Sequence, residues 1–245
     1  MGITCSLCLA IKGNKMKKSK IISDIRVYKS VVDNIDGNSM PASLGNKPLN
    51  ITVHRIVMKL WENGFSLGAF DHLYINLTTC IESGQIQPAK RSVNRYHPWY
   101  RYYDVGIEPE LFDVLGSEAA IGSVVEKVEQ VLIASFSADK ATEQMIQASV
   151  KEAVELGPDM LMRFKEKKSA KCTAILYLRQ LDNVKYKPLL CVYDLEGKEL
   201  LREDLPETLE LNAFGEILLS SKKVTIKPRK NFFTRDMEPI TFVFG

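Results

Sequence analysis

Histidine is the residue type best suited to acid–base chemistry near neutral pH, and this chain has three: His54, His72 and His97. Two imidazoles acting with a lysine can cleave RNA, because one ring removes a proton while the other supplies one. His54 and His97 flank expected strands and His72 lies inside one, so their spacing does not bring any two together. We therefore expect solvated or hydrogen-bonded structural roles, with a catalytic pair as the alternative.

Two other short patterns were considered as sites. Residues 64–68, GFSLG, have neither the spacing of a dinucleotide-binding glycine loop nor the lysine of a phosphate-binding loop. Cys5 and Cys8 have the spacing of half a zinc site, but no second ligand pair follows at a suitable distance. The sequence thus predicts a protein that is not an enzyme and needs no metal, cofactor or small-molecule substrate.

The segment NRYHPWYRYYDVG, residues 94–106, interleaves aromatic rings with arginines. Such rings offer stacking surfaces to unpaired nucleic-acid bases, and tyrosine and tryptophan are also frequent anchors of protein interfaces. In a strand, Tyr100 and Tyr102 face one way. Trp99 and Tyr103 face the other way. We expect one face to pack in the core and the other to form a tyrosine-bearing surface; a protein interface and base stacking are both open for that surface.

Charge is unevenly distributed near the end of the chain, although the net charge is only +3. Residues 194–210 have seven acids and two bases, and residues 222–235 have six bases and no acid. A solvated hairpin followed by a charged edge strand would account for this pattern, and so would an acidic face that docks a basic protein. For docking, the candidate contacts are Asp194, Glu196, Glu199, Glu203, Asp204 and Glu207, with Tyr100 and Tyr102 as aromatic anchors.

The first elements expected to position these residues are strands. Residues 50–60 are apolar and partly β-branched, residues 71–79 alternate with a period of two, and residues 95–107 form the next strand candidate. Residues 33–50 are rich in Asn, Gly, Pro and Ser and predict a loop. We therefore assign residues 1–48 to an N-terminal tail and loop, partly disordered.

The middle of the chain predicts two helices. Ser123 and Glu126 have the spacing of a capping box at the start of the first helix. Asp139 precedes the second helix, and Gly157 with Pro158 ends it.

The last third predicts strands again, including a hairpin that turns at residues 194–197. Strands, then helices, then strands indicate an α+β protein, with antiparallel sheets from the N-terminal and C-terminal parts and two central helices. Residues 49–245 would form a single domain.

The first twenty residues allow three interpretations. Their M-G-x-x-x-S pattern fits myristoylation of Gly2, and Cys5 could take a second acyl chain beside the following lysines. The apolar residues 3–11 are a weak match to a signal peptide, since no positive charge precedes them. The third interpretation is an upstream extension, with the ordinary chain start at Met16. We expect membrane contact only if Gly2 or Cys5 carries lipid.

The five cysteines are scattered along the chain. An odd, scattered set favours a reducing compartment over a disulfide framework. No apolar run approaches the roughly 20 residues that a membrane helix needs. We expect a cytoplasmic protein.

Several longer segments resemble one protein family. HRIVMKLWENGFSLGAFDHLYINLTTC (residues 54–80) and HPWYRYYDVGI (97–107) resemble bacterial immunity proteins of polymorphic toxin systems, including contact-dependent growth inhibition. The resemblance extends through residues 160–171, 188–208 and 220–233, without a catalytic signature. It implies a cytoplasmic antidote that binds a cognate toxin domain, often a nuclease, and blocks its active site without catalysis or cofactor.

Our sequence-based prediction is such an immunity protein, with the acidic segment as the contact surface. The alternative is a single-stranded nucleic-acid-binding module that uses the aromatic strand 95–107 and the basic segment 222–235. The modest net charge makes nucleic acid the less favoured partner.

Overall fold

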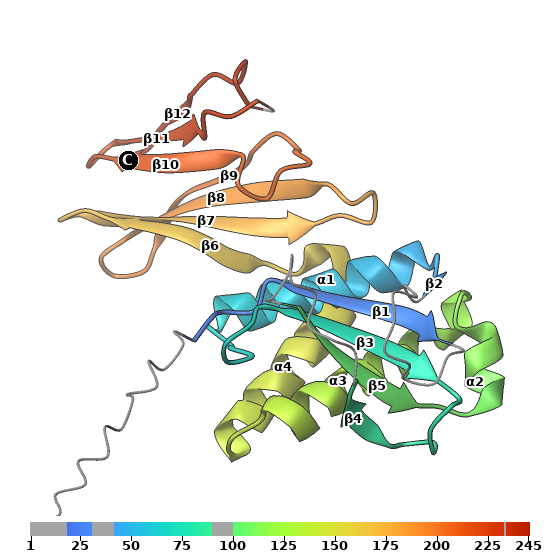
Figure 1. The fold of residues 1–245 in the computed structure, drawn as a ribbon. Helices are drawn as coiled ribbons and strands as arrows, with labels where there is room; N and C mark the ends of the chain where they lie inside the picture. Colours follow the sequence, from blue (N-terminus) through green and yellow to red (C-terminus); the bar gives the residue numbers. More distant parts are fainter. Residues whose placement is uncertain (1–18, 31–41, 90–99, 233) are drawn as a thin grey trace, which may run out of the picture.

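The computed structural model describes residues 19–30, 42–89, 100–232 and 234–245. Three β-sheets and three long helices build the molecule (Figure 1). A five-stranded sheet and the helices form its lower part in that view, and a four-stranded and a three-stranded sheet are stacked above them. The predicted α+β class, with N-terminal and C-terminal sheets and central helices, is confirmed. The long strands of the N-terminal sheet are parallel, however, where antiparallel strands were expected.

The five-stranded sheet has the order β2-β1-β3-β5-β4. Its three long strands run parallel, and the two short edge strands pair antiparallel to their neighbours. The strands are β1 (Asp24–Ser30), β2 (Ala42–Ser43), β3 (His72–Thr78), β4 (Ile86–Pro88) and β5 (Tyr100–Gly106). Residues 24–30 were assigned to the N-terminal tail and loop, but they form β1 between β2 and β3.

The strand expected over residues 50–60 is wrong, because these residues belong to the helix α1 (Lys47–Glu62). Parallel strands need a crossover connection, and α1 provides it between β1 and β3. Asn46 caps the helix, since its side chain accepts a hydrogen bond from the Leu49 backbone N–H at 3.1 Å. The apolar residues Leu49, Val53, Ile56 and Leu60 recur at helical spacing and are buried.

The two predicted central helices are α3 (Ile121–Phe136) and α4 (Lys140–Leu156). Asp139 caps α4 as expected, with its carboxylate 2.7 Å from the Thr142 backbone N. The capping box at Ser123 is wrong, because α3 begins at Ile121 directly after a 3-10 turn at Glu118–Ala120. A short helix, α2 (Pro109–Val114), follows β5. None of the helices in the described part of the chain is both long and apolar enough to cross a membrane.

The C-terminal part is a sandwich of two antiparallel sheets. The strands of the larger sheet are β6 (Met162–Lys168), β7 (Cys172–Gln180), β8 (Tyr186–Asp194) and β9 (Glu199–Asp204). Those of the smaller sheet are β10 (Phe214–Leu219), β11 (Lys223–Pro228) and β12 (Ile240–Val243). The predicted hairpin at residues 194–197 is the β8–β9 connection.

The helical part and the sandwich are joined by side chains of α1 that reach the β7–β8 hairpin. The buried Arg55 donates two hydrogen bonds to the Gln180 carbonyl, at 3.1 and 2.7 Å, and one to Asp182 at 2.7 Å. His54 Nε2 lies 2.7 Å from the Tyr186 hydroxyl. One hydrophobic core includes the helices, the five-stranded sheet and the sandwich residues Leu178 and Tyr186, so the two parts share buried contacts.

Candidate binding surface

Nine polar or aromatic side chains of β1, β3 and β5 share one face of the five-stranded sheet, whereas Lys29 and Arg101 lie on the other face. Side chains alternate along a strand, and the other face packs its apolar residues against α1, α3 and α4. The strand register aligns the polar side chains in three rows. The rows are Asp24, His72 and Tyr100; Arg26, Tyr74 and Tyr102; and Tyr28, Asn76 and Asp104. We call these nine residues the aromatic face.

Tyr74 is the centre of the aromatic face and is only 3% exposed. Its ring centroid lies 5.7 Å from that of Tyr28, 4.7 Å from that of Tyr100 and 5.0 Å from that of Tyr102. Burial and the neighbouring Tyr100 hydroxyl raise the pKa of Tyr74, so the phenol stays neutral. The prediction that Tyr100 and Tyr102 share a face is confirmed. Three half-buried tyrosines thus surround a buried one.

The aromatic face carries little unpaired charge. Arg26 Nε lies 2.7 Å from an oxygen of Asp24, and the guanidinium is 5.6 Å from the Tyr74 ring centroid. Burial opposes the charge of Arg26, but the Asp24 carboxylate outweighs it and raises the arginine pKa. Beside the face, Lys20 lies 3.3 Å from Asp71. Among the charged side chains of the face, these pairs leave Asp104 without a cation partner in the described residues.

A buried polar pair lies toward the carboxyl ends of the parallel strands. Asn76 is fully buried and Asp104 nearly so, and the asparagine amide donates a 2.8 Å hydrogen bond to the carboxylate. The Asn76 carbonyl oxygen is buried without a hydrogen-bond partner in the described residues. Buried polar groups are normally paired, so this pair orders the sheet at the cost of one unpaired acceptor.

The histidines form no catalytic pair in the described residues. His72 Nδ1 contacts both Asp71, at 2.7 Å, and Ser23 Oγ, at 3.3 Å. In a Ser-His-Asp triad the carboxylate and the serine use opposite ring nitrogens, so this arrangement holds the ring and relays no proton. Burial lowers the pKa of His54, which is bonded to Tyr186. His97 lies outside the described residues.

One serine motif was missed by the sequence reasoning. Residues 64–68 have the Gly-x-Ser-x-Gly spacing of a hydrolase nucleophile elbow, which joins a strand to a following helix. Here the segment follows a helix and precedes a strand. Ser66 Oγ donates to the Lys20 carbonyl at 2.7 Å and accepts from the Gly68 N–H at 3.0 Å. Ser66 therefore links the turn after α1 to the segment before β1 by hydrogen bonds.

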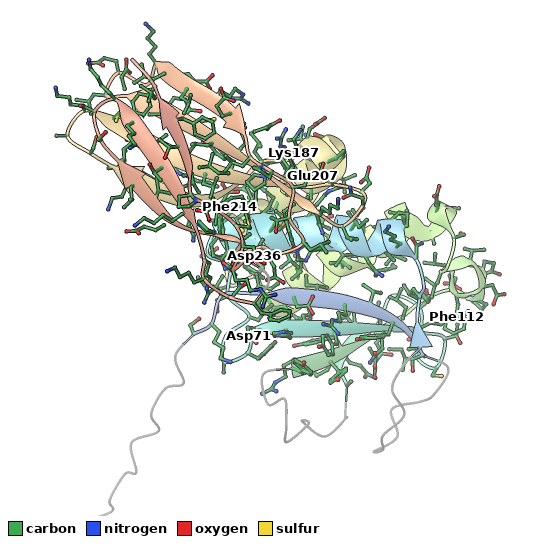
Figure 2. The ribbon with its side chains drawn as sticks, turned by 90° about the horizontal axis from the view of Figure 1, so that it is seen from above. Asp71, Phe112, Lys187, Glu207, Phe214 and Asp236 are labelled. Carbon is green, nitrogen blue, oxygen red and sulfur yellow. The ribbon has the colours of Figure 1, made fainter. Side chains whose placement is uncertain are left out.

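The predicted acidic contact surface lies on β8, β9 and the following loop, on the sandwich and not on the sheet of Tyr100 and Tyr102. Asp204 forms ion pairs with Arg179 and, at 2.9 Å, with Lys187. Burial would raise the pKa of Asp204, but these two cations outweigh it and lower the pKa. Glu207 lies 3.3 Å from Lys185. Figure 2 shows the labelled Lys187 and Glu207 on the same side of the molecule.

The remaining acids of that surface differ in their surroundings. Glu199 pairs with Arg202 at 3.0 Å. Asp194 accepts backbone N–H groups inside the β8–β9 turn, including that of Glu196 at 3.1 Å. Glu196 and Glu203 are exposed, and within the described residues neither has an ion pair. The surface therefore has mixed charge, with Glu196 and Glu203 as its uncompensated acids.

The residues proposed for nucleic-acid binding are spread over two sheets. The aromatic strand β5 is in the five-stranded sheet, whereas β11 carries part of the basic segment in the three-stranded sheet at the opposite end of Figure 1. Lys227 of that segment pairs with Glu216 at 3.1 Å. Residues 95–99 of the predicted strand, including Trp99, lie outside the described residues. Tyr103, on the inward face, packs against Phe136 with centroids 5.4 Å apart.

The described residues contain no cluster of three or more His, Cys, Asp or Glu side chains able to hold a metal ion. No protein-family model matches the chain, and neither curated proteins nor solved structures give a match.

Proposed function

We propose that this protein is a cytoplasmic bacterial antidote that binds a cognate toxin domain, in the manner of polymorphic-toxin immunity proteins, and blocks it without catalysis. The resemblance described above supplies the class of partner. The observation that carries the contact surface is the aromatic face, where three half-buried tyrosines surround Tyr74. Tyrosine and arginine dominate the energetics of protein interfaces.

Charge pairing on the aromatic face favours a protein partner over nucleic acid. Nucleic-acid affinity comes largely from cations that neutralise phosphates. Arg26 is already paired with Asp24 at 2.7 Å, and Lys20 with Asp71 at 3.3 Å. Tyrosine rings beside paired cations suit a desolvated protein contact, in which an unpaired cation would be costly.

Single-strand binding is the second candidate, because tyrosines on one face of a sheet are also the stacking platforms of RNA-binding modules. It predicts affinity for single-stranded RNA that falls steeply as salt is raised. An antidote surface predicts toxin binding that survives the same salt series.

The test is co-expression with the toxin domain that the proposal expects to be encoded immediately upstream of this gene. The antidote proposal expects the two proteins to elute together, with nanomolar affinity, and the host to grow. If no complex forms and the host dies, the proposal fails. Binding to single-stranded RNA across a salt series would then decide for the second candidate.

A further inference from the structure

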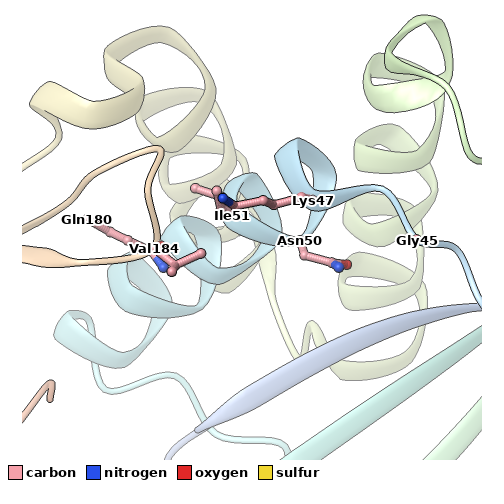
Figure 3. Close-up of a pocket in the computed structure, with 6 residues that line it drawn as sticks. All are labelled: Gly45, Lys47, Asn50, Ile51, Gln180 and Val184. Carbon is pink, nitrogen blue, oxygen red and sulfur yellow. The ribbon is translucent and has the colours of Figure 1, made fainter. Parts of the chain in front are cut away.

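A groove lies between the start of α1 and the β7–β8 hairpin, where the two parts of the molecule meet (Figure 3). Its volume is about 250 Å³. Its walls are Gly45, Lys47, Asn50 and Ile51 on the helix side and Gln180 and Val184 on the hairpin side. A volume of this size suits a ligand of roughly one amino-acid residue, since cavities of ~150 Å³ already hold benzene.

Gln180 lines this groove and carries an unsatisfied polar group. The residue is only 5% exposed, and its side-chain oxygen is buried with no hydrogen-bond partner in the described residues. Its backbone carbonyl is fixed by two hydrogen bonds from Arg55. In Figure 3 the Gln180 side chain runs toward Val184 along the groove. An unpaired buried acceptor is costly, so a small rotation of the amide toward a ligand donor would be favourable.

Val184 faces Gln180 across the hairpin tip in an unusual conformation. Its φ is +68°, and it is the sole non-glycine residue with positive φ in the part of the chain that the structure describes. A β-branched side chain is strained there, whereas Gly or Asn would not be. The strain holds an aliphatic wall opposite the buried Ile51. Strained positions of this kind concentrate at ligand sites.

The helix side of the groove is electropositive. Lys47 is the first residue of α1, and the first helical turn contains no acid to offset the positive end of the helix dipole. The Lys47 side chain extends along the helix toward Ile51 in Figure 3. The groove therefore combines a cation, an aliphatic gap and an unused hydrogen-bond acceptor.

We propose that this groove binds an aliphatic carboxylate with an adjacent N–H donor. That chemistry is shared by a free aliphatic amino acid and by the last residue of a peptide. The carboxylate pairs with Lys47 at the positive end of α1, the side chain lies between Ile51 and Val184, and the N–H donates to the Gln180 amide oxygen. Each of these three ligand groups therefore contacts one feature of the groove: the cation, the aliphatic gap or the unpaired acceptor.

The test titrates the full chain with three probes and measures binding by the changes in chemical shift. N-acetyl-L-leucine has the carboxylate and a peptide-like N–H, L-leucine has the carboxylate and an ammonium, and N-acetyl-L-leucinamide lacks the carboxylate. We expect saturable binding of at least one acid with a dissociation constant of about 1 mM, as suits ligands of this size. The amide should bind at least about tenfold more weakly. The tighter acid identifies a peptide end or a free amino acid as the source.

Three variants assign the contacts. Lys47→Gln should weaken binding of the acid about tenfold, and the matched control Lys167→Gln, on β6, should not. Val184→Asn keeps a residue that tolerates positive φ but removes the aliphatic wall, and should also weaken binding. Gln180→Met should abolish binding while raising the melting temperature, because it removes an unpaired buried acceptor.

If Gln180 serves the ligand, Gln180→Met should lose binding and gain stability. If Gln180 had a structural role, the same variant should lose stability. Equal binding of acid and amide, or no saturable binding of either acid, would overturn the proposal. So would acid binding that Lys47→Gln and Gln180→Met leave unchanged.

Discussion

His54 and Tyr186 connect α1 to β8 through a 2.7 Å contact between imidazole Nε2 and the phenol oxygen. Their ring centroids lie 6.1 Å apart; Tyr186 is buried, and His54 is partly buried. Burial and the charge of Glu210 raise the pKa of Tyr186 to about 12, so the phenol keeps its proton and donates it. The imidazole that accepts it must be neutral, in keeping with a pKa lowered chiefly by burial.

This contact predicts a loss of stability in mild acid. The pKa of His54 in the folded protein lies below the ordinary value of 6.5, so only the unfolded chain takes up a proton as the pH first falls below 6.5. The contribution of His54 to the free energy of unfolding is therefore largest above pH 6.5 and decreases below it, by at most about 1.4 kcal/mol per pH unit. His54→Gln, which can still accept from Tyr186, should flatten this part of the profile. Urea unfolding between about pH 7.5 and 5.5 measures it, and equal slopes for the two proteins would refute it.

Gly106 is the last residue of β5 and lies against the backbone of a loop, so a side chain at this position would clash with it. A Cβ built on it would lie 1.9 Å from the Glu82 carbonyl oxygen, whereas one on Gly122 of α3 meets nothing within 4 Å. Gly106→Ala should destabilise the protein by about 1–3 kcal/mol or more, since backbone must shift. Gly122→Ala, in the first turn of α3, should stabilise it by up to about 0.5–1 kcal/mol, because alanine loses less backbone freedom than glycine on entering a helix. Thermal unfolding of the two variants should move in opposite directions, and matching shifts would contradict the geometry.

Replacing one partner of the buried Asn76–Asp104 hydrogen bond should destabilise the protein more than replacing both partners. Asn76→Leu leaves a buried carboxylate without its donor and should cost about 1–3 kcal/mol. The double variant Asn76→Leu with Asp104→Leu should recover part of that loss, because no unpaired charge remains. Denaturant unfolding gives both values, with the exposed Asn212→Ala as control. A double variant as unstable as the sum of the singles would show that the pair is not coupled.

The acidic surface is best tested at the two acids without internal ion pairs. If β9 helps to steer the toxin, Glu196→Lys with Glu203→Lys should slow association about tenfold at low salt and less at high salt. Glu199→Lys and Asp204→Lys are poorer tests, because they also break pairs with Arg202, Arg179 and Lys187. Stopped-flow association rates, with Glu118→Lys as control, measure the effect. An unchanged rate would remove the acidic surface from the interface.

Local patterns predicted those elements whose signal is contained in a few residues. The Asp139 cap, the stop at Gly157 and the turn after Asp194 depend on residues within one turn of each other. The helix α1 was mistaken for a strand because its β-branched residues, such as Val53 and Ile56, favour strands when their helical spacing is overlooked.

The candidate surface was only half predictable, because its residues come from three separate strands. Alternation within β5 placed Tyr100 and Tyr102 on one face. That Arg26, Tyr74 and Tyr102 form one row depends on parallel pairing across more than 70 residues of chain, which no local pattern encodes. Likewise, the pairing of Asp204 with Arg179 and Lys187 depends on the sheet register. An acidic run in the sequence is therefore a mixed surface in the fold.

The most direct test of the antidote account is the affinity of the expected toxin partner for the Tyr102→Ala protein. The account predicts a loss of about 30-fold or more relative to the unchanged protein, as for an interface hot spot. Phe232→Ala is the matched control, an aromatic side chain 74% exposed on the distant sandwich, and should bind as the unchanged protein does. Circular dichroism confirms that both variants are folded. Full toxin affinity in the Tyr102→Ala protein would contradict the aromatic face as the binding surface.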